Sequence, residues 1–248
     1  MSCFPQGYER RVLQVVDSTL DEARRVAGSL SGPTWILALQ QSAARGRRGR
    51  AWQMPLGNFA ATLVLPETRP DQAALRSFVV SLALRQTCVA LSGRDSDFEL
   101  KWPNDVLLRG GKLAGILLES IGIAGAVSHV AIGVGVNLAA APDAADLEAE
   151  ALRPVSMRGA LGVHVAPEDF LDHLAEAYAQ FEDQFSTYGF APIRVAWLEH
   201  AARLGQVITA RTGNAVQTGT FVDVDATGQL VLETPKGRTA IPAADVYF

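Results

Sequence analysis

The sequence predicts an α+β fold followed by a small all-β module, and three observations support this fold class. Apolar residues recur at helical spacing in several long segments. Short apolar runs, bounded by glycine, proline and other turn-forming residues, lie between these segments, as is typical of strands. From Leu204 onward only short runs of this kind remain, at close spacing, so we expect a separate β-module there.

Composition places the chain among globular proteins. It has 248 residues, of which 48% are hydrophobic and 19% charged, and its net charge is −4. Disorder requires few apolar residues and a high net charge, and this chain has neither. At roughly 150 residues per domain, the length suits one domain with a small appendage. The acidic balance argues against general binding of nucleic acid.

The lack of a visible targeting signal and the small number of cysteines favour a cytoplasmic protein with no membrane partner. No apolar run approaches the ~18 residues that a membrane span needs. Residues 1–11 contain no apolar core of a secretory signal. Two cysteines, Cys3 and Cys88, are too few for a disulfide framework, and no zinc-ligand pattern surrounds them. A reducing cytoplasm is therefore the expected location.

The first part of the chain alternates strands and helices. Thr19 with Glu22 three residues later is a capping-box pattern, so we expect a helix from Thr19 to about Leu30. Residues 42–58 are rich in arginine and glycine and are interpreted as a loop. The remaining elements here are strands at Val12–Val16, Trp35–Leu39 and Phe59–Leu65, and a helix from Pro70 to about Leu91.

The second part begins with strands and turns helical. Short turns, including a Gly110-Gly111 hairpin signal, separate expected strands at Phe98–Trp102, Val106–Leu108, Lys112–Ser120 and Val127–Leu138. Residues 139–190 carry ten acidic residues against two arginines, which we interpret as a solvated helix face. Helices are expected at Pro167 to about Tyr188 and at Ile193–Arg203. The β-module has expected strands at Val207–Arg211, Thr218–Val224, Gln229–Glu233 and Arg238–Ile241.

The segment Gln40–Trp52 carries four arginines and no acidic residue. Gly46 and Gly49 keep its backbone permissive. Guanidinium groups match phosphate oxygens, so a mobile loop of this kind suits an anionic ligand. Trp52 adds an aromatic surface on which a nucleotide base can stack. A plain exposed loop or a nucleic-acid patch is the alternative.

A second candidate segment reads K-W-P-N-D-V-L-L-R-G-G-K-L-A-G-I-L-L-E. Pro103 excludes a regular central strand, so Trp102, Asn104 and Asp105 lie at a break from which side chains can turn toward a ligand. Lys112 begins the next strand and suits a phosphate or carboxylate. Asp105 could hold Mg²⁺ together with substrate phosphates. The alternative is a solvated lysine and a turn-forming aspartate.

The third segment, S-H-V-A-I-G-V-G-V-N-L, separates into two faces when read with period two. One face is apolar, and the other carries Gly133, Gly135 and Asn137. Glycines on one face suggest close approach of a ligand or of another packed element. Asn137 could read a nucleobase edge because its amide both donates and accepts. The spacing is that of neither a Rossmann fingerprint nor a Walker A loop.

Nothing in the sequence indicates a covalent nucleophile. No Ser-His-Asp or Cys-His arrangement is evident, and the four histidines have no metal-ligand spacing. Ser18 and Thr19 lie at a strand-to-helix junction, where hydroxyls either cap the helix or contact a polar ligand.

Together these segments resemble the biotin protein ligases. R-G-R-R-G-R-x-W, K-W-P-N-D, G-K-L-A-G-I-L-x-E and G-x-G-x-N are weak signals singly but specific in this order, and the resemblance covers about residues 12–248. It implies a mixed sheet flanked by helices, related to class II aminoacyl-tRNA synthetase catalytic domains, and a small SH3-like barrel. The expected domains are residues 1–203 and 204–248.

The resemblance also implies roles for single residues. The biotin-binding positions would be Ser18, Thr19, Gln41, Arg45, Arg47, Lys112, Leu113, Gly115 and Leu117. The nucleotide-binding positions would be Arg47, Arg48, Arg50, Trp52, Asn104, Lys112 and Asn137, with Asp105 as a Mg²⁺ ligand. Lys112 and Arg47 would be catalytic, and Lys101, Asn104 and Asp105 would occupy conserved-motif positions of the family. The family usually has glycine where this chain has Ala44, which would be strained if its φ were positive.

The implied reaction has two steps. Biotin reacts with ATP and Mg²⁺ to give biotinyl-5′-AMP and pyrophosphate, and a lysine of a biotin carboxyl carrier protein then accepts the biotin. The Ser-Thr motif already lies at positions 18 and 19, so we expect a ligase without the helix-turn-helix domain of some family members. The protein is expected as a monomer or homodimer without nucleic-acid partners. A lipoate or octanoyl transfer enzyme on the related fold and a nucleic-acid-binding module are the competing hypotheses.

Overall fold

Two β-sheets organise the part of the chain that this computed structural model describes: residues 4–66, 69–123, 126–142, 152–212, 215–242 and 244–247. The larger sheet has seven strands in the order β1-β2-β3-β7-β6-β5-β4. Only its β1–β2 pair is parallel among the described strands, so the sheet is mixed, as expected. The strands are β1 (Glu9–Val16), β2 (Thr34–Gln41), β3 (Phe59–Pro66), β4 (Phe98–Lys101), β5 (Asp105–Leu108), β6 (Gly111–Ile123) and β7 (Ala126–Val136).

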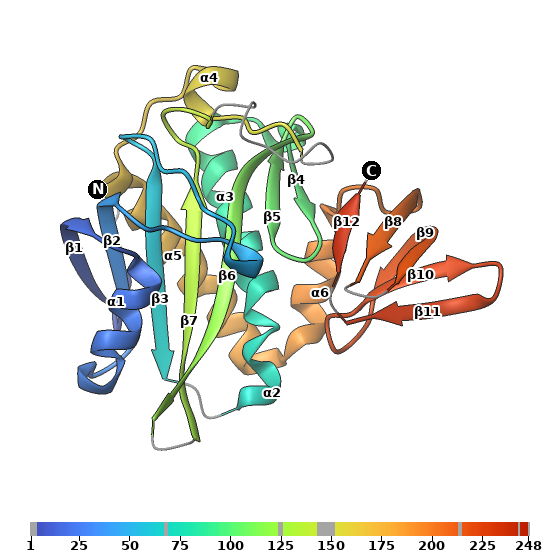
Figure 1. Ribbon diagram of the computed structural model, residues 1–248, viewed down its shortest axis with the longest axis horizontal. Coiled ribbons are helices and arrows are strands. Elements are labelled where there is room, and N and C mark those ends of the chain that lie inside the picture. The colour runs from blue at the N-terminus through green and yellow to red at the C-terminus, as the bar shows by residue number, and fades with distance from the viewer. Residues whose placement is uncertain are drawn as a thin grey trace.

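The helices cover the two faces of this sheet unequally (Figure 1). One face carries α1 (Thr19–Val26), which packs on β2, β3 and β7. The opposite face carries α3 (Arg76–Ser92), α5 (Pro167–Tyr188) and α6 (Phe190–Glu199). Two further helices are short, α2 (Pro70–Ala73) and α4 (Met157–Leu161). Helices therefore flank the sheet on both sides, which confirms the predicted fold class.

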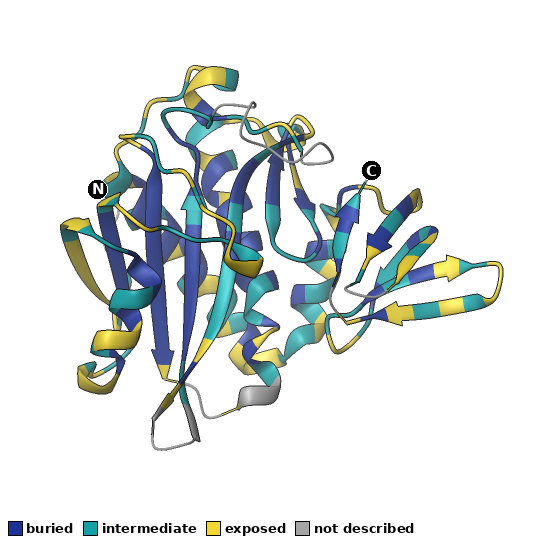
Figure 2. Cartoon of the chain, viewed as in Figure 1, coloured by how far each residue is buried: buried dark blue, intermediate teal, exposed yellow. Residues whose placement is uncertain are grey.

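Buried side chains form a large core behind the sheet and a small core beneath α1 (Figure 2). The large core contains the fully buried rings of Trp35, Phe59, Phe170 and Trp197. In contrast, β1 is an edge strand whose residues are mostly exposed. The layer that covers the sheet is therefore thinner on the α1 side than on the opposite side. The candidate site lies on the α1 side.

The long acidic helix is confirmed at its predicted bounds. Pro167 occupies the first turn of α5, where a missing N–H costs nothing, and Glu168 and Asp169 complement the positive helix end. Gly189 follows with φ of 72°, and α6 begins at the next residue. The sequence had predicted the start of α6 at Ile193. The sharp junction at Gly189 leaves no connecting loop by which the true start could be recognised.

The start of α1 differs from the capping-box prediction. Ser18 has extended backbone and is the N-cap, and its Oγ accepts from the backbone N–H of Leu20 at 3.2 Å. Thr19 is the first helical residue, and its hydroxyl instead accepts from the Thr62 hydroxyl at 2.8 Å. The capping-box pattern makes Thr19 the N-cap and was wrong by one residue, because the Thr19 hydroxyl is bonded to the buried Thr62 hydroxyl of β3 instead of the helix backbone.

The second sheet is antiparallel, with five strands in the order β11-β10-β9-β8-β12. Its strands are β8 (Val207–Arg211), β9 (Val216–Val224), β10 (Leu230–Thr234), β11 (Gly237–Ile241) and β12 (Asp245–Tyr247). β12 was not predicted, because three residues are too few to display a period of two. The predicted turn at residues 212–214 lies partly outside the described residues.

Specific polar contacts join this C-terminal sheet to the rest of the chain. The Trp102 indole N–H donates to the carbonyl of Gly228 at 3.0 Å, and Arg194 of α6 pairs with Asp223 of β9 at 2.5 Å. The expectation that Trp102 turns toward a ligand is therefore wrong: its ring is buried at this junction. No helix in the described ranges has the length and apolar character needed to span a membrane.

Candidate active site

A cavity of about 510 Å³ opens on the α1 side of the large sheet. Its walls come from the α1 N-terminus, from β2, β6 and β7, from the arginine loop (residues 42–52) and from β12. Within the described residues, its cationic lining is Arg45, Arg47, Arg50, Lys101 and Lys112, and its acidic lining is Asp105 and Asp245. The balance is positive, so the cavity favours an anionic ligand.

A polar corner lies where β1 ends and α1 begins. Ser18 and Thr19 are buried here, and the Thr19 N–H donates to Gln41 Oε1 at 2.7 Å. This hydrogen bond fixes the Gln41 amide, whose nitrogen lies 3.6 Å from Met54 Sδ. Because Leu117 and Gly133 line the same cavity, the corner combines a few fixed hydrogen-bonding groups with apolar wall. Such a lining suits a small, mostly apolar ligand with a polar ring.

A β-bulge at Leu113 aims Lys112 into the cavity. The pairing of β5 with β6 skips Leu113. Strict alternation would put Lys112 on the face opposite Gly115 and Leu117, and the extra residue brings these positions to one face. Leu113 itself is fully buried in the large core and is not among the described residues lining the cavity, unlike the expectation for it.

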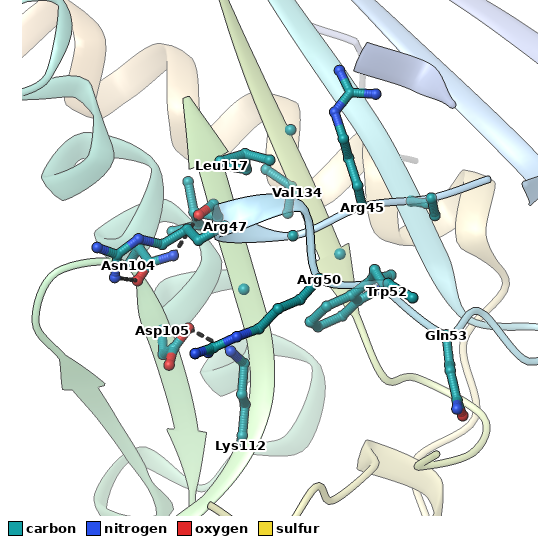
Figure 3. A pocket seen from close by; sticks show the side chains of 18 of the residues that line it. Arg45, Arg47, Arg50, Trp52, Gln53, Asn104, Asp105, Lys112, Leu117 and Val134 are labelled. Atoms are coloured by element: carbon teal, nitrogen blue, oxygen red, sulfur yellow. Dashed lines mark hydrogen bonds and ion pairs between the residues drawn. The ribbon is translucent and has the colours of Figure 1, made fainter. Parts of the chain in front are cut away.

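Lys112 is held by a carboxylate and lies over an aromatic ring. Its Nζ is 2.8 Å from Asp105 Oδ1 and 5.7 Å from the centroid of the Trp52 ring (Figure 3). The ammonium is thereby held between the Asp105 carboxylate and the Trp52 ring. Asn104 is also fixed, because its Nδ2 donates to the carbonyl of Ile116 at 2.6 Å.

Lys101 is a second lysine in the cavity lining. Burial lowers the pKa of its ammonium, Asp105 opposes this shift and the Lys112 charge adds to it. The pair Lys101–Asp105 closes the β4–β5 hairpin, on either side of the turn that contains Pro103. The K-W-P-N-D segment thus contributes two charged groups and an amide to one wall.

The arginine loop uses its arginines in different ways. Arg45 points away from Lys112 and Trp52 (Figure 3) and pairs with Asp21 at 2.5 Å and Glu119 at 3.1 Å. Arg47 and Arg50 line the cavity, and Arg48 is not among the described lining residues. Ala44 is not among the described residues with positive φ, so alanine in place of the usual glycine brings no left-handed strain.

Trp52 lies against the glycine face of β7. A Cβ on Gly135 would be 2.6 Å from Trp52 Cε2, and a Cβ on Gly115 would be 3.2 Å from Cζ3. A Cβ on Gly133 would instead meet Leu20 of α1 at 3.0 Å. The close approach suggested by the glycines is thus made by packed side chains, one of which belongs to the arginine loop.

Asn137 is buried and directly follows β7. Its Oδ1 accepts from Asn58 Nδ2 at 3.4 Å, and Asn58 also bonds the backbone of Ala139 and Ala140. Asn58 was not among the predicted site residues; it is a buried polar residue immediately before β3. It orients the Asn137 amide, whose side chain lines the cavity.

Residues of β12 also line the cavity, and these were missed altogether. Asp245, Val246 and Tyr247 approach the arginine loop from the C-terminal sheet. The Asp245 carboxylate is 2.7 Å from Arg48, 3.5 Å from Arg47 and 3.7 Å from Arg50. In the sequence, the one sign of this strand is a single acidic residue, Asp245, within a short apolar run.

A magnesium ion fits one position of this lining. No group of three or more His, Cys, Asp or Glu side chains suited to a metal occurs among the described residues. Mg²⁺ is commonly held by one or two carboxylates together with substrate phosphates. Asp105, whose carboxylate lies in the cationic part of the cavity, meets that requirement.

Comparisons with known proteins agree with the residue pattern. The chain matches the model of the Biotin/lipoate A/B protein ligase family over residues 12–137 and that of the Biotin protein ligase C terminal domain over residues 204–248. It is 54% identical to the biotin–[acetyl-CoA-carboxylase] ligase of Paracoccus denitrificans, over 96% of this chain and 99% of that protein.

Two solved structures have a similar fold. One is the biotin protein ligase of Aquifex aeolicus in complex with biotin and ATP, with a TM-score of 0.80, 21% identity and coverage of 96% of this chain and 97% of that one. The other is the biotin protein ligase of Leishmania major in complex with biotinyl-5-AMP, with a TM-score of 0.67, 21% identity and coverage of 96% and 100%.

Proposed function

This chain belongs to the biotin protein ligase family, and we propose that its cavity activates biotin with ATP and then passes it to a carrier-protein lysine. The observation that carries the proposal is the convergence on one cavity of segments that lie far apart in the sequence. A polar, partly apolar corner adjoins a cationic region that ends at an aromatic ring and a buried amide. This order of subsites matches biotin, phosphates and adenine laid end to end.

The biotin subsite is proposed at the polar corner. Ser18, Thr19 and Gln41 supply hydrogen-bonding groups for the ureido ring, and Gly115 and Leu117 line the apolar part. Because these groups already hold one another in place, little ordering is left for the ligand to bring about.

The nucleotide subsite is proposed between the arginine loop and β7. Trp52 offers a ring for the adenine, and Asn137, oriented by Asn58, offers a donor and an acceptor for its edge. Arg47, Arg50 and Asn104 would contact the phosphates. Mg²⁺, held by Asp105 and the phosphates, would neutralise charge on the leaving group.

The first step joins the two ligands. A carboxylate oxygen of biotin attacks the α-phosphorus, the bond to the pyrophosphate oxygen breaks, and biotinyl-5′-AMP forms. Lys112 lies between the two subsites, where its fixed charge stabilises the crowded anions of this transition state. Arg47 adds charge from the loop side. No protein nucleophile is required, because holding the two ligands in line replaces covalent catalysis.

The second step uses a lysine from the carrier protein. Its neutral amine attacks the acyl carbon of the mixed anhydride, AMP departs with the bonding electrons, and the nitrogen releases one proton to solvent as the amide forms. Until the carrier docks, the arginine loop would cover the anhydride and keep water from it. The substrate is proposed to be a biotin carboxyl carrier domain, in line with the name of the Paracoccus relative.

The proposed domain division follows the two sheets. Residues 1–203 would form the catalytic domain, and residues 204–248 a C-terminal domain that contributes β12 to the cavity. The match that begins at residue 204 and the separate antiparallel sheet support this division.

Biotin-dependent exchange between ATP and pyrophosphate tests the proposal directly. Folded protein should exchange label only when biotin and Mg²⁺ are both present, and no exchange by folded protein would refute the assignment. A lipoate or octanoyl transferase is the second candidate, because the matched family includes lipoate enzymes. A thermal shift with biotin and none with lipoate separates the two.

A further inference from the structure

The arginine loop is tied to the C-terminal sheet through one carboxylate. Asp245 of β12 faces the guanidinium groups of Arg47, Arg48 and Arg50, and its side chain is only 14% exposed. Arg48 is the nearest of the three, and its ion pair with Asp245 has a separation of 2.7 Å. β12 is itself held by antiparallel pairing with β8, so the carboxylate is presented from a fixed strand.

The backbone of Arg48 supports a fastening role for its side chain. Arg48 has φ of 57°, and Gly49 beside it has φ of 73°. An L-residue in the left-handed region costs roughly 1 kcal/mol relative to glycine, and such strain persists only where the surroundings hold the residue in place. The ion pair with Asp245 ties the side chain of this residue to β12, while backbone hydrogen bonds from Gly46 to Arg50 and from Arg50 to Arg47 close the turn around it.

The loop is fastened at its start as well. Arg45 is bound by Asp21 of α1 and Glu119 of β6, on the side away from Lys112. Arg47 lies between Arg45 and Arg48, Arg50 follows two residues after Arg48, and both line the cavity. Arg47 is further steered by the carbonyl of Ala244 at 3.4 Å, next to Asp245.

We propose that Asp245 is a positioning residue of the ligase reaction, which fastens the arginine loop across the domain boundary through Arg48 and so aims Arg47 and Arg50 into the cavity. This inference rests on the proposed function. It changes the role expected for Arg48 from nucleotide contact to anchor. Loss of the carboxylate would also leave three neighbouring cations without their shared counter-charge.

The test compares Asp245→Asn, Arg48→Gln and the double variant in the full-length protein. Asp245→Asn should raise the KM for ATP about tenfold with kcat changed less than about threefold, since a smaller fraction of the loop is then competent to bind. The KM for biotin should change by less than about twofold, because the biotin subsite lies at the Arg45 end of the loop, away from Asp245. Asp245→Glu, which keeps the charge, should recover most of the lost affinity.

A double-mutant cycle shows whether the two residues act through each other. The double variant should have the same KM for ATP as Asp245→Asn alone. If the double variant's increase in the KM for ATP equals the product of the two single increases, Arg48 contacts the nucleotide independently of Asp245. That result would overturn the anchor assignment. A lower KM for ATP in Asp245→Asn would also overturn it, because Asp245 would then be a competitor of the phosphates.

Hydrogen exchange gives a readout that does not require activity. The Gly46 N–H donates to the carbonyl of Arg50 at 2.7 Å, and the Trp52 N–H donates to the carbonyl of Ala44 at 2.9 Å. Asp245→Asn should accelerate exchange of the peptide covering residues 44–52 by about fivefold, because the closed loop becomes less populated. Unchanged exchange would refute the fastening.

Asp223→Asn is the matched control. It breaks the Arg194–Asp223 ion pair, which also joins the two sheets but lies away from the loop. It should leave both loop exchange and the KM for ATP unchanged, and an effect equal to that of Asp245→Asn would show general loosening instead of positioning. If wild-type protein shows no pyrophosphate exchange, the proposed function is refuted. Hydrogen exchange of residues 44–52 still shows whether Asp245 fastens the loop.

Discussion

Gly135→Ala should move Trp52 and weaken ATP binding selectively. The added Cβ would lie 2.6 Å from Trp52 Cε2, 2.7 Å from Nε1 and 2.8 Å from Cζ2. Carbon atoms pack at about 3.5–4.0 Å, so the ring must retreat by roughly 1 Å. Gly135 lies in the paired interior of β7, whereas Trp52 ends a loop, so the ring yields rather than the strand.

The size of the effect follows from what the ring supplies. Stacking of a base on an aromatic side chain contributes about 1–3 kcal/mol, and a displaced ring retains part of it. We expect a loss of about 1.4 kcal/mol, which is a tenfold rise in the KM for ATP. Steady-state pyrophosphate exchange at varied ATP and saturating biotin measures it, and the KM for biotin should change by less than twofold.

Two further variants make this reasoning refutable. Gly32→Ala adds a methyl group that would contact only the Gly7 carbonyl oxygen, at 3.9 Å, and controls for the general effect of replacing glycine. In a Trp52→Ala background, Gly135→Ala should have no additional effect, because the clash is gone. A wild-type KM for ATP in Gly135→Ala, or an undiminished effect without the ring, would refute the role of Trp52 as nucleotide platform.

Three other changes have distinct expected results. Lys112→Ala should slow adenylation by about 10²–10³-fold, by analogy with removal of one preorganised charge-stabilising group; pyrophosphate exchange measures this, and a loss below fivefold would remove Lys112 from the chemical step. Arg47→Gly should release biotinyl-5′-AMP, detected as biotin on unrelated proteins mixed with the enzyme, and strict retention of carrier-only labelling would contradict its role. Burial raises the pKa of the Cys88 thiol to about 12, so at pH 8 it should resist alkylation in native protein and react after unfolding, as peptide mapping will show; rapid native labelling would contradict its burial.

Elements set by local pattern were predictable from the sequence. The helix Pro167–Tyr188 and the strand Val207–Arg211 are found at their predicted bounds, because proline, glycine and a regular apolar period mark them. The two faces of β7 were also predicted, since alternation is a property of the strand alone.

Features that depend on distant partners were not predictable. The bulge at Leu113 is set by the pairing of β6 with β5, and no local pattern reveals that it redirects Lys112. Asn58 acquires its role only because the chain after β7 returns beside it. Asp245 is an ordinary residue of a short strand until the C-terminal sheet packs against the arginine loop.

The participation of β12 in the cavity sets an order of events during biosynthesis. The contact of Arg47 with Ala244 joins residues 197 positions apart. At ~5–20 residues per second, a ribosome makes the second partner roughly 10–40 s after the first. The seven-stranded sheet can form on the nascent chain in that interval, while its arginine loop still lacks the carboxylate that anchors it. Newly made molecules therefore become competent catalysts only after β12 has been made and has taken its place beside the loop.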